Sequence, residues 1–207
     1  KFQRYMQDYL ATISSIDDNV GRVLDYLDNN NLTENTIVVY TSDQGFYLGE
    51  HGWYDKRFIY DESFKTPLMI RWPNKIKPGI SSEEMVQNLD FAQTFLEAAM
   101  ISAPSDMQGE SLIPLMTGEN SKWTRESVYY HYYEYPSVHM VKRHYGIVNK
   151  EYKLAHFYYD VDEWELYDRI NDPNEMNNVY NDPNYANVVK KLTQELKELG
   201  IKYKDSE

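Results

Sequence analysis

A run of β-branched and apolar residues at positions 36–41 (TIVVYT) most restricts the folds that this chain can adopt. Such a continuous run is typical of a strand that is covered on both faces, as in a sheet with helices on each side. An amphipathic helix precedes it, because apolar residues recur every three or four positions from Met6 to Leu27. Polar residues 42–45 (SDQG) follow the strand directly. This order predicts an α/β fold, in which ligands bind at the carboxyl edge of the sheet.

Further segments extend this pattern toward the middle of the chain. Residues 67–72 (PLMIRW) predict a second apolar strand, and an aromatic-rich loop over residues 46–66 separates it from the first strand. A loop of that length inside a compact domain is usually functional. Residues 89–100 predict another helix, with Asn88 as its cap.

From Ser127 the sequence changes to short strands bounded by Pro, Asn, Lys or Asp. A helix over residues 185–199 then follows, with Gly200 as its predicted stop. We therefore predict a large α/β domain over residues 1–120 and a smaller α+β unit over residues 121–207. The strands of the smaller unit, which favour an antiparallel sheet, are predicted over residues 128–133, 138–148, 152–158 and 164–167.

Charge and composition exclude several classes of partner and site. Lys and Arg number 21 and Asp and Glu number 33, so the formal net charge is −12, and no basic block occurs. A nucleic-acid partner and an anionic membrane surface are therefore disfavoured, and no segment is apolar enough to span a membrane. The lack of cysteine excludes disulfides and thiolate metal sites. The chain opens at Lys1 without an initiator Met, so we expect it to be part of a longer protein.

Asp43 and Gln44 are candidate metal ligands because they follow the predicted buried strand directly. Their carboxylate and amide oxygens suit Ca²⁺ or Mg²⁺ better than zinc. The alternative is an Asx-type turn that only closes the end of the strand. Spacing alone does not choose between the two interpretations.

Residues 49–57 (GEHGWYDKR) bring His51, Lys56 and Arg57 close to the proposed metal ligands. Cationic side chains can hold an oxyanion, and a histidine can exchange a proton near neutral pH. The alternative is a solvated loop in which Asp55, Lys56 and Arg57 pair with one another.

Residues 41–73 (TSDQGFYLGEHGWYDKRFIYDESFKTPLMIRWP) resemble the carboxyl-terminal catalytic segment of type I sulfatases, which belong to the alkaline phosphatase superfamily. The resemblance extends to residues 9–21, which resemble a family helix, and to residues 165–178, which resemble its tail signature. It implies the carboxyl-terminal part of an alkaline-phosphatase-like α/β sandwich, followed by a small antiparallel sheet with a carboxyl-terminal helix.

The resemblance also implies roles for individual residues. Asp43 and Gln44 match two ligands of a Ca²⁺ ion, with Mg²⁺ the less favoured alternative. Lys56 lies thirteen positions after Asp43, which matches a lysine that contacts the sulfate, and His51 matches a histidine near the sulfate.

Residues 129–147 (YYHYYEYPSVHMVKRHYGI) are most similar to bacterial sulfatases that remove a 6-O-sulfate from N-acetylglucosamine. In these enzymes the Asp and Arg that flank the lysine bind sugar hydroxyls, which points to Asp55 and Arg57 here. A histidine from the small sheet also reaches the sugar, and we select His144 over His139 for this role. The alternative for either histidine is a structural role within the sheet.

The family nucleophile is a formylglycine made from a Cys/Ser-x-Pro-x-Arg motif, which is absent from this chain. We therefore expect the remaining metal ligands and the nucleophile to come from a missing amino-terminal half, with a sulfated glycan such as a glycosaminoglycan or a mucin-type glycan as substrate. Glycan-degrading relatives imply a periplasmic or exported location. Two alternatives remain open, namely a phosphoesterase or phosphonate hydrolase of the same superfamily and a non-catalytic module that binds a sulfated glycan.

Overall fold

The structure is a computed structural model that describes residues 1–205. These residues form two compact units. The first contains residues 1–40 and 69–80, and the second contains residues 41–68 and the chain from Ser81 onward. Among residues 1–205, no helix combines the length and the apolar character that a membrane crossing requires. The predicted domain boundary near residue 120 stays a prediction.

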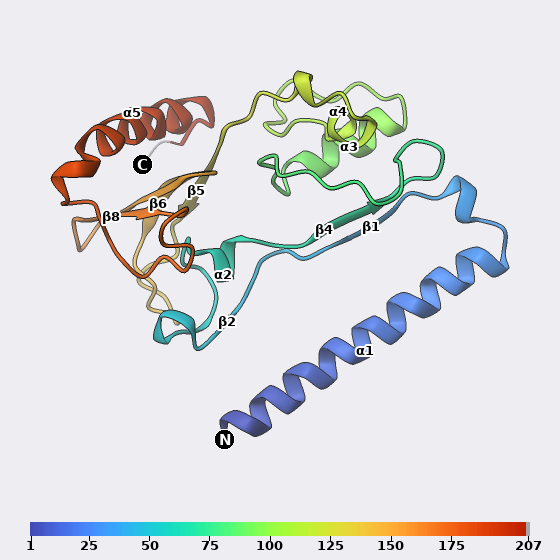
Figure 1. Ribbon diagram of the computed structural model, residues 1–207, viewed down its shortest axis with the longest axis horizontal. Coiled ribbons are helices and arrows are strands. Elements are labelled where there is room, and N and C mark those ends of the chain that lie inside the picture. Colours follow the sequence, from blue (N-terminus) through green and yellow to red (C-terminus); the bar gives the residue numbers. More distant parts are fainter. Residues whose placement is uncertain (206–207) are drawn as a thin grey trace. The chain divides into compact units, whose positions relative to one another are not determined.

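The first unit contains one long helix and a pair of strands (Figure 1). Helix α1 spans Phe2–Asn29, and strand β1 (Val38–Thr41) is hydrogen-bonded to strand β4 (Leu68–Arg71). These elements confirm the helix and the two strands predicted from the sequence. An amphipathic helix normally buries its apolar face, but no residue of α1 is buried among residues 1–205: Leu10 and Ile16 are 55% and 46% exposed, and Leu24 and Leu27 are only partly covered.

The second unit is built around a four-stranded antiparallel sheet in the order β5-β6-β7-β8. The antiparallel sheet predicted for this region is confirmed, and helix α5 follows it. The strands and this helix span Ser127–Tyr132, His144–Asn149, Tyr152–Phe157, Glu163–Asp168 and Ala186–Lys202.

The two faces of this sheet carry different parts of the chain. Helix α5 covers one face, where Leu192 and Leu196 pack with Ile147, Leu154 and Leu166. The following residue on two of these strands points to the other face, because successive side chains alternate. There Val148 and Ala155 pack against Ile59, so the segment around Ile59 lies on the face opposite α5.

Short elements complete the second unit. Strands β2 (Tyr47–Leu48) and β3 (Tyr54–Asp55) pair antiparallel on either side of a short 3₁₀ turn at Glu50–Gly52. Helix α2 follows at Asp61–Phe64, and helices α3 and α4 span Asp90–Ala98 and Ile113–Thr117.

Three details differ from the sequence predictions. Strand β6 begins at His144 rather than at residue 138, because a turn after Pro136 places Met140 at φ 56°, which a strand cannot continue. Asn88 does not cap α3, whose first turn follows Leu89 without a side-chain cap. Gly200 does not stop α5, which continues to Lys202.

Candidate active site

The loop at residues 42–45 holds the two proposed metal ligands. Asp43 is exposed, and its Oδ1 accepts a hydrogen bond from the backbone N–H of Gln44 at 3.0 Å. Ser42 Oγ donates to the carbonyl oxygen of Gln44 at 2.8 Å. Neither bond is that of an Asx turn, in which the Asp side chain accepts the N–H two residues further on. Asp43 Oδ2 makes no hydrogen bond among residues 1–205.

Gly45 seats this loop against α2. Its N–H donates to the carbonyl oxygen of Ser63 at 2.7 Å. A Cβ atom at position 45 would lie 1.9 Å from the carbonyl oxygen of Glu62, a distance that excludes any side chain. The glycine of the SDQG sequence is thus required by close backbone approach.

The chemistry of Asp43 and Gln44 fits part of a site for a hard cation. Ca²⁺ takes six to eight oxygen ligands, whereas these two consecutive residues offer one carboxylate and one amide oxygen. Within the described part of the chain, no three His, Asp or Glu residues gather as a metal site. The remaining oxygens of such a site would have to come from other parts of the protein.

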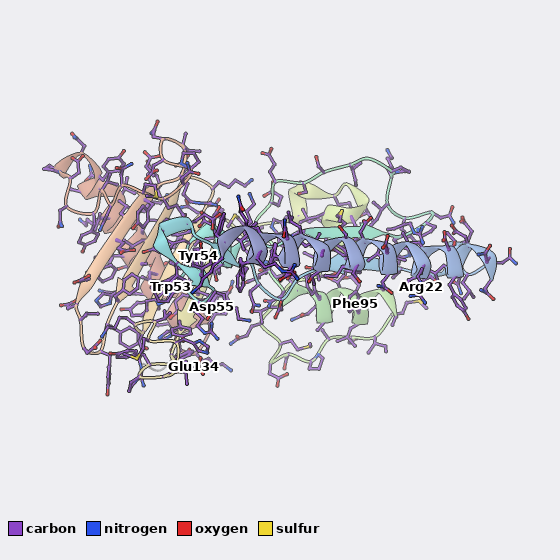
Figure 2. The ribbon with its side chains drawn as sticks, turned by 90° about the horizontal axis from the view of Figure 1, so that it is seen from below. Arg22, Trp53, Tyr54, Asp55, Phe95 and Glu134 are labelled. Atoms are coloured by element: carbon purple, nitrogen blue, oxygen red, sulfur yellow. The ribbon has the colours of Figure 1, made fainter. Side chains whose placement is uncertain are left out.

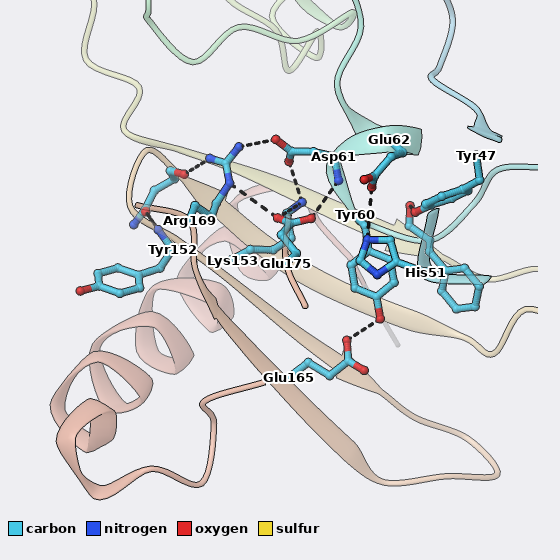
Figure 3. Close-up of polar contacts among 12 residues, drawn as sticks. Tyr47, His51, Tyr60, Asp61, Glu62, Tyr152, Lys153, Glu165, Arg169 and Glu175 are labelled. Carbon is cyan, nitrogen blue, oxygen red and sulfur yellow. Dashed lines mark hydrogen bonds and ion pairs between the residues drawn. The ribbon is translucent and has the colours of Figure 1, made fainter. Parts of the chain in front are cut away.

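His51 lies in the 3₁₀ turn with φ 52°, and its ring is held on three sides. It stacks on Tyr60 with ring centroids 4.4 Å apart, and it meets the ring of Tyr47 edge-on at 6.1 Å. Its Nε2 lies 3.3 Å from Glu62 Oε2 (Figure 3). These ring contacts place the imidazole beside a carboxylate, and the 3.3 Å approach is an ion-pair distance rather than a hydrogen bond, because neither atom has a hydrogen-bond partner among residues 1–205.

Asp55, Arg57 and His139 form a compact charged cluster. Arg57 Nη1 lies 2.6 Å from Asp55 Oδ2, and Arg57 Nη2 lies 2.7 Å from His139 Nε2. His139 Nδ1 lies 3.2 Å from the same Asp55 oxygen. Glu134 Oε2 is 3.9 Å from Arg57 Nε, and Asp55 and Glu134 are labelled in Figure 2. The pairing of Asp55 with Arg57 that the solvated-loop alternative required is present, but it includes a histidine 82 residues away in sequence.

The backbone of this cluster is strained. Asp55 and Arg57 have φ angles of 107° and 98°, which residues with a side chain rarely adopt. The N–H of Arg57 donates to Ser63 Oγ at 2.8 Å, and its carbonyl oxygen accepts from Tyr130 Oη at 2.6 Å. Strain of this kind persists only where surrounding contacts hold it, and it is common at functional sites.

Lys56 lies between the two strained residues and is half-buried. Unlike Asp55 and Arg57, it makes no hydrogen bond or ion pair with any residue that the structure describes. A half-buried ammonium group without a carboxylate partner can bind an anion from solution.

His144 lies apart from this cluster and is fully buried. Its Nδ1 is 2.8 Å from the carbonyl oxygen of Lys142, and its ring packs against Phe58 and Phe157. Burial lowers the pKa of His144 to about 4, so the ring is neutral at physiological pH. The role given to His144 in sugar binding stays a prediction, and the contacts described above favour His139.

Sequence reasoning did not find Tyr60 and Glu62, the two residues that hold His51. The signal was present as an aromatic residue and two acidic residues in the aromatic-rich loop, at residues 60–62. Nothing in the spacing shows that Glu62 faces His51 while the adjacent Asp61 faces Lys153 and Arg169.

Comparison with known proteins places these residues in a family. A family model described as "N-sulphoglucosamine sulphohydrolase, C-terminal" matches residues 49–202. The N-acetylglucosamine-6-O-sulfatase of Bacteroides thetaiotaomicron is 53% identical over 210 residues, which cover 100% of this chain and 38% of the relative.

Two solved structures share the fold. A protein in complex with its substrate D-glucosamine-2-N,6-O-disulfate matches with a TM-score of 0.96 and 53% identity, over 100% of this chain and 42% of the solved chain. The phosphonate monoester hydrolase of Agrobacterium radiobacter matches with a TM-score of 0.81 and 25% identity, over 92% and 40% of the two chains. The chain thus spans about two fifths of the length of these relatives, and the predicted α/β sulfatase fold is confirmed. By the match over residues 49–202, the chain belongs to the sulfatase family described as N-sulphoglucosamine sulphohydrolase, C-terminal.

Proposed function

We propose that this chain supplies the substrate-binding side of a carbohydrate sulfatase that removes the 6-O-sulfate from N-acetylglucosamine or a related glucosamine. The cluster of Asp55, Arg57 and His139 beside the unpartnered Lys56 carries the proposal. The 53% identity to an N-acetylglucosamine-6-O-sulfatase over the whole chain supports it.

Each part of the cluster has a distinct task in this proposal. Lys56 binds the sulfate, because its ammonium charge has no carboxylate partner among residues 1–205. Asp55 and Arg57 bind sugar hydroxyls through an acceptor and a donor that already face each other at 2.6 Å. We assign the sugar contact to His139 in place of His144, because His139 contacts both Arg57 and Asp55.

His51 lies beside the sulfate and exchanges or donates a proton there, with Glu62 holding its ring. Sulfatase relatives imply a metal ion and a formylglycine in general. Asp43 and Gln44 would hold the metal, which we propose to be Ca²⁺ rather than Mg²⁺ because of their oxygen ligands. When bound, the ion would stabilise negative charge on the sulfate oxygens, and the formylglycine nucleophile would come from outside this chain.

The proposal includes the biological setting. The substrate is a sulfated glycan, of the glycosaminoglycan or mucin type, and the protein acts in the periplasm or outside the cell, as glycan-degrading relatives do. The domain arrangement proposed from the sequence, residues 1–120 in the catalytic domain and 121–207 in a smaller subdomain, completes this assignment.

The test measures sulfate release from glucosamine-2-N,6-O-disulfate and from N-acetylglucosamine-6-sulfate by the full-length protein that contains this chain. Mass spectrometry of the product shows which sulfate leaves. We expect loss of the 6-O-sulfate, and Lys56→Ala to lower kcat/KM by about 10²–10³, the effect of removing one group that stabilises charge in a transition state. Lys190→Ala, which removes an exposed lysine of α5, is the matched control and should leave kcat/KM unchanged.

Other outcomes would support the alternatives. Turnover of phosphonate monoesters without sulfate release would support the phosphonate hydrolase, whose fold this chain shares. Binding of a sulfated glycan without any turnover would support a non-catalytic module.

A further inference from the structure

Helix α2 (Asp61–Phe64), only four residues long, touches three separate parts of the candidate site. The carbonyl oxygen of Ser63 accepts the N–H of Gly45, which seats the loop of the proposed metal ligands. The hydroxyl of Ser63 accepts the N–H of Arg57 at 2.8 Å. Glu62 faces His51 at 3.3 Å. A displacement of α2 would therefore move all three parts together.

A partly buried cluster of four charged side chains holds α2 against the sheet (Figure 3), with Lys153 and Glu175 buried and Asp61 and Arg169 25% and 18% exposed. Lys153 of β7, whose side chain is 0% exposed, lies 2.8 Å from Asp61 Oδ1 and 2.5 Å from Glu175 Oε1. Arg169 Nη2 lies 2.8 Å from Asp61 Oδ2. Glu175 Oε2 also accepts the backbone N–H of Asp61 at 2.9 Å, so the first residue of α2 is held through both its side chain and its backbone.

The cluster contains two cationic and two acidic side chains, and burial raises the pKa of Glu175 despite its contact with Lys153. Burial acts to raise the pKa of Asp61, but the charges and hydrogen bonds of Lys153 and Arg169 outweigh it, so its pKa lies below the usual value. A buried ion pair often contributes no more net stability than apolar residues of the same volume, but removal of one partner is strongly destabilising because it leaves a buried charge uncompensated. Such a cluster can fix the position of α2 through its contacts with Asp61.

A second contact fixes the residue just before α2. Tyr60 Oη donates to Glu165 Oε2 of β8 at 2.8 Å, and the Tyr60 ring stacks on His51. Strand β8 thus holds Tyr60, and the charged cluster holds the adjacent Asp61, in the segment that contacts His51. Glu175 belongs to the tail signature at residues 165–178, which the proposed catalytic roles leave without a task.

We infer that Lys153, Asp61, Arg169 and Glu175 are positioning residues, which act through α2 to align His51, Arg57 and the loop at Gly45. This inference rests on the proposed function, because it assigns a task to that same site. The cluster orients His51 whether or not the protein cleaves sulfate esters.

The test compares three variants of the full-length protein. Asp61→Asn removes one charge of the cluster at nearly constant volume, and Ser63→Ala removes the hydroxyl that accepts the Arg57 N–H. Asp90→Asn is the matched control. It weakens another buried ion pair of the second unit, in which Arg125 contacts Asp90 at 2.5 and 2.7 Å.

Two readouts are taken at a temperature where circular dichroism shows every variant to be folded. One is kcat/KM on the sulfated glucosamine, and the other is the ¹⁵N NMR signal of the His51 imidazole, assigned by its loss in His51→Asn. We expect Asp61→Asn and Ser63→Ala to lower kcat/KM about 10–100-fold, the scale that a misplacement of about 1 Å produces. Asp61→Asn should also shift the His51 signal. Asp90→Asn should change kcat/KM by less than about twofold and move the His51 signal by less than its linewidth.

The inference is overturned if Asp61→Asn leaves the His51 signal in place, or if Asp90→Asn changes both readouts as much as Asp61→Asn does. If the wild-type protein releases no sulfate from any substrate, the proposed function fails. In that case the His51 signal alone decides the inference, by whether it moves in Asp61→Asn and stays in Asp90→Asn.

Discussion

The buried, neutral His144 predicts a specific acid sensitivity of the fold. Its pKa is about 4 in the folded protein, against 6.5 for an unperturbed histidine, because burial disfavours the charged ring. The unfolded chain therefore binds a proton more readily between these two values, so the free energy of unfolding falls as the pH drops from 6.5 toward 4. Above pH 6.5 the contribution is fully present.

The expected magnitude follows from the size of the pKa shift. At about 1.36 kcal/mol per pKa unit, the full contribution is about 3 kcal/mol. Between pH 7 and pH 5 the linkage relation gives a loss of about 2 kcal/mol from this one side chain.

Urea denaturation of the wild type and of His144→Phe, at pH 7 and at pH 5, measures this loss. Phenylalanine keeps a ring beside Phe58 and Phe157, although it gives up the bond to the carbonyl oxygen of Lys142. The absolute stabilities of the two proteins will differ, but the quantity of interest is the change with pH. We expect the variant to lose about 2 kcal/mol less than the wild type between the two pH values.

His156→Phe provides the control for this measurement. His156 lies on the same sheet, but it contacts Asp162 at the surface and its side chain is 16% exposed. Its replacement shows whether loss of any imidazole from the sheet changes the pH dependence as His144→Phe does. The reasoning is refuted if wild type and His144→Phe show the same change with pH, or if His156→Phe removes as much of the pH dependence as His144→Phe.

Three further predictions concern the site. Gly45→Ala should lower the free energy of unfolding by about 1–3 kcal/mol, as measured by chemical denaturation, because the added Cβ would lie 1.9 Å from a carbonyl oxygen of α2; unchanged stability would contradict the close approach. Glu62→Gln should lower kcat/KM about tenfold in steady-state assays, since it removes the carboxylate that faces His51, and equal activity at an equal melting temperature would count against that role. Chelation of divalent cations should abolish sulfate release, and Ca²⁺ should restore it better than Mg²⁺ if Asp43 and Gln44 hold the ion, whereas activity that survives chelation would exclude a metal role for them.

Local elements of this fold follow from local patterns. The three-and-four spacing of apolar residues from Met6 to Leu27 predicts α1, and the apolar runs at residues 36–41 and 67–72 predict β1 and β4. Residues far away in sequence decide whether an apolar face is covered. The spacing within α1 therefore could not show that none of its residues is buried among residues 1–205. The strand predicted over residues 138–148 is too long because nothing in the sequence marks the turn at Met140, which the positive φ angle of that residue reveals.

The candidate site shows the same division between near and distant neighbours. Asp55 and Arg57 are two positions apart, so their ion pair could be predicted, whereas Lys56 between them makes no ion pair among residues 1–205. Residue spacing gave no basis for choosing between His139 and His144. In the structure the turn before β6 brings His139 to Arg57, whereas the sheet buries His144.

The left-handed backbone at Asp55 and Arg57 has a consequence for evolution in the laboratory. Each of these angles costs about 1–3 kcal/mol, and a glycine would relieve most of that energy. Glycine at either position would also remove the contacts among Asp55, Arg57 and His139, so relief of strain at these positions comes at the expense of the charged cluster. Natural proteins commonly accept such a trade between durability and activity, and these two residues are where we expect it in this chain.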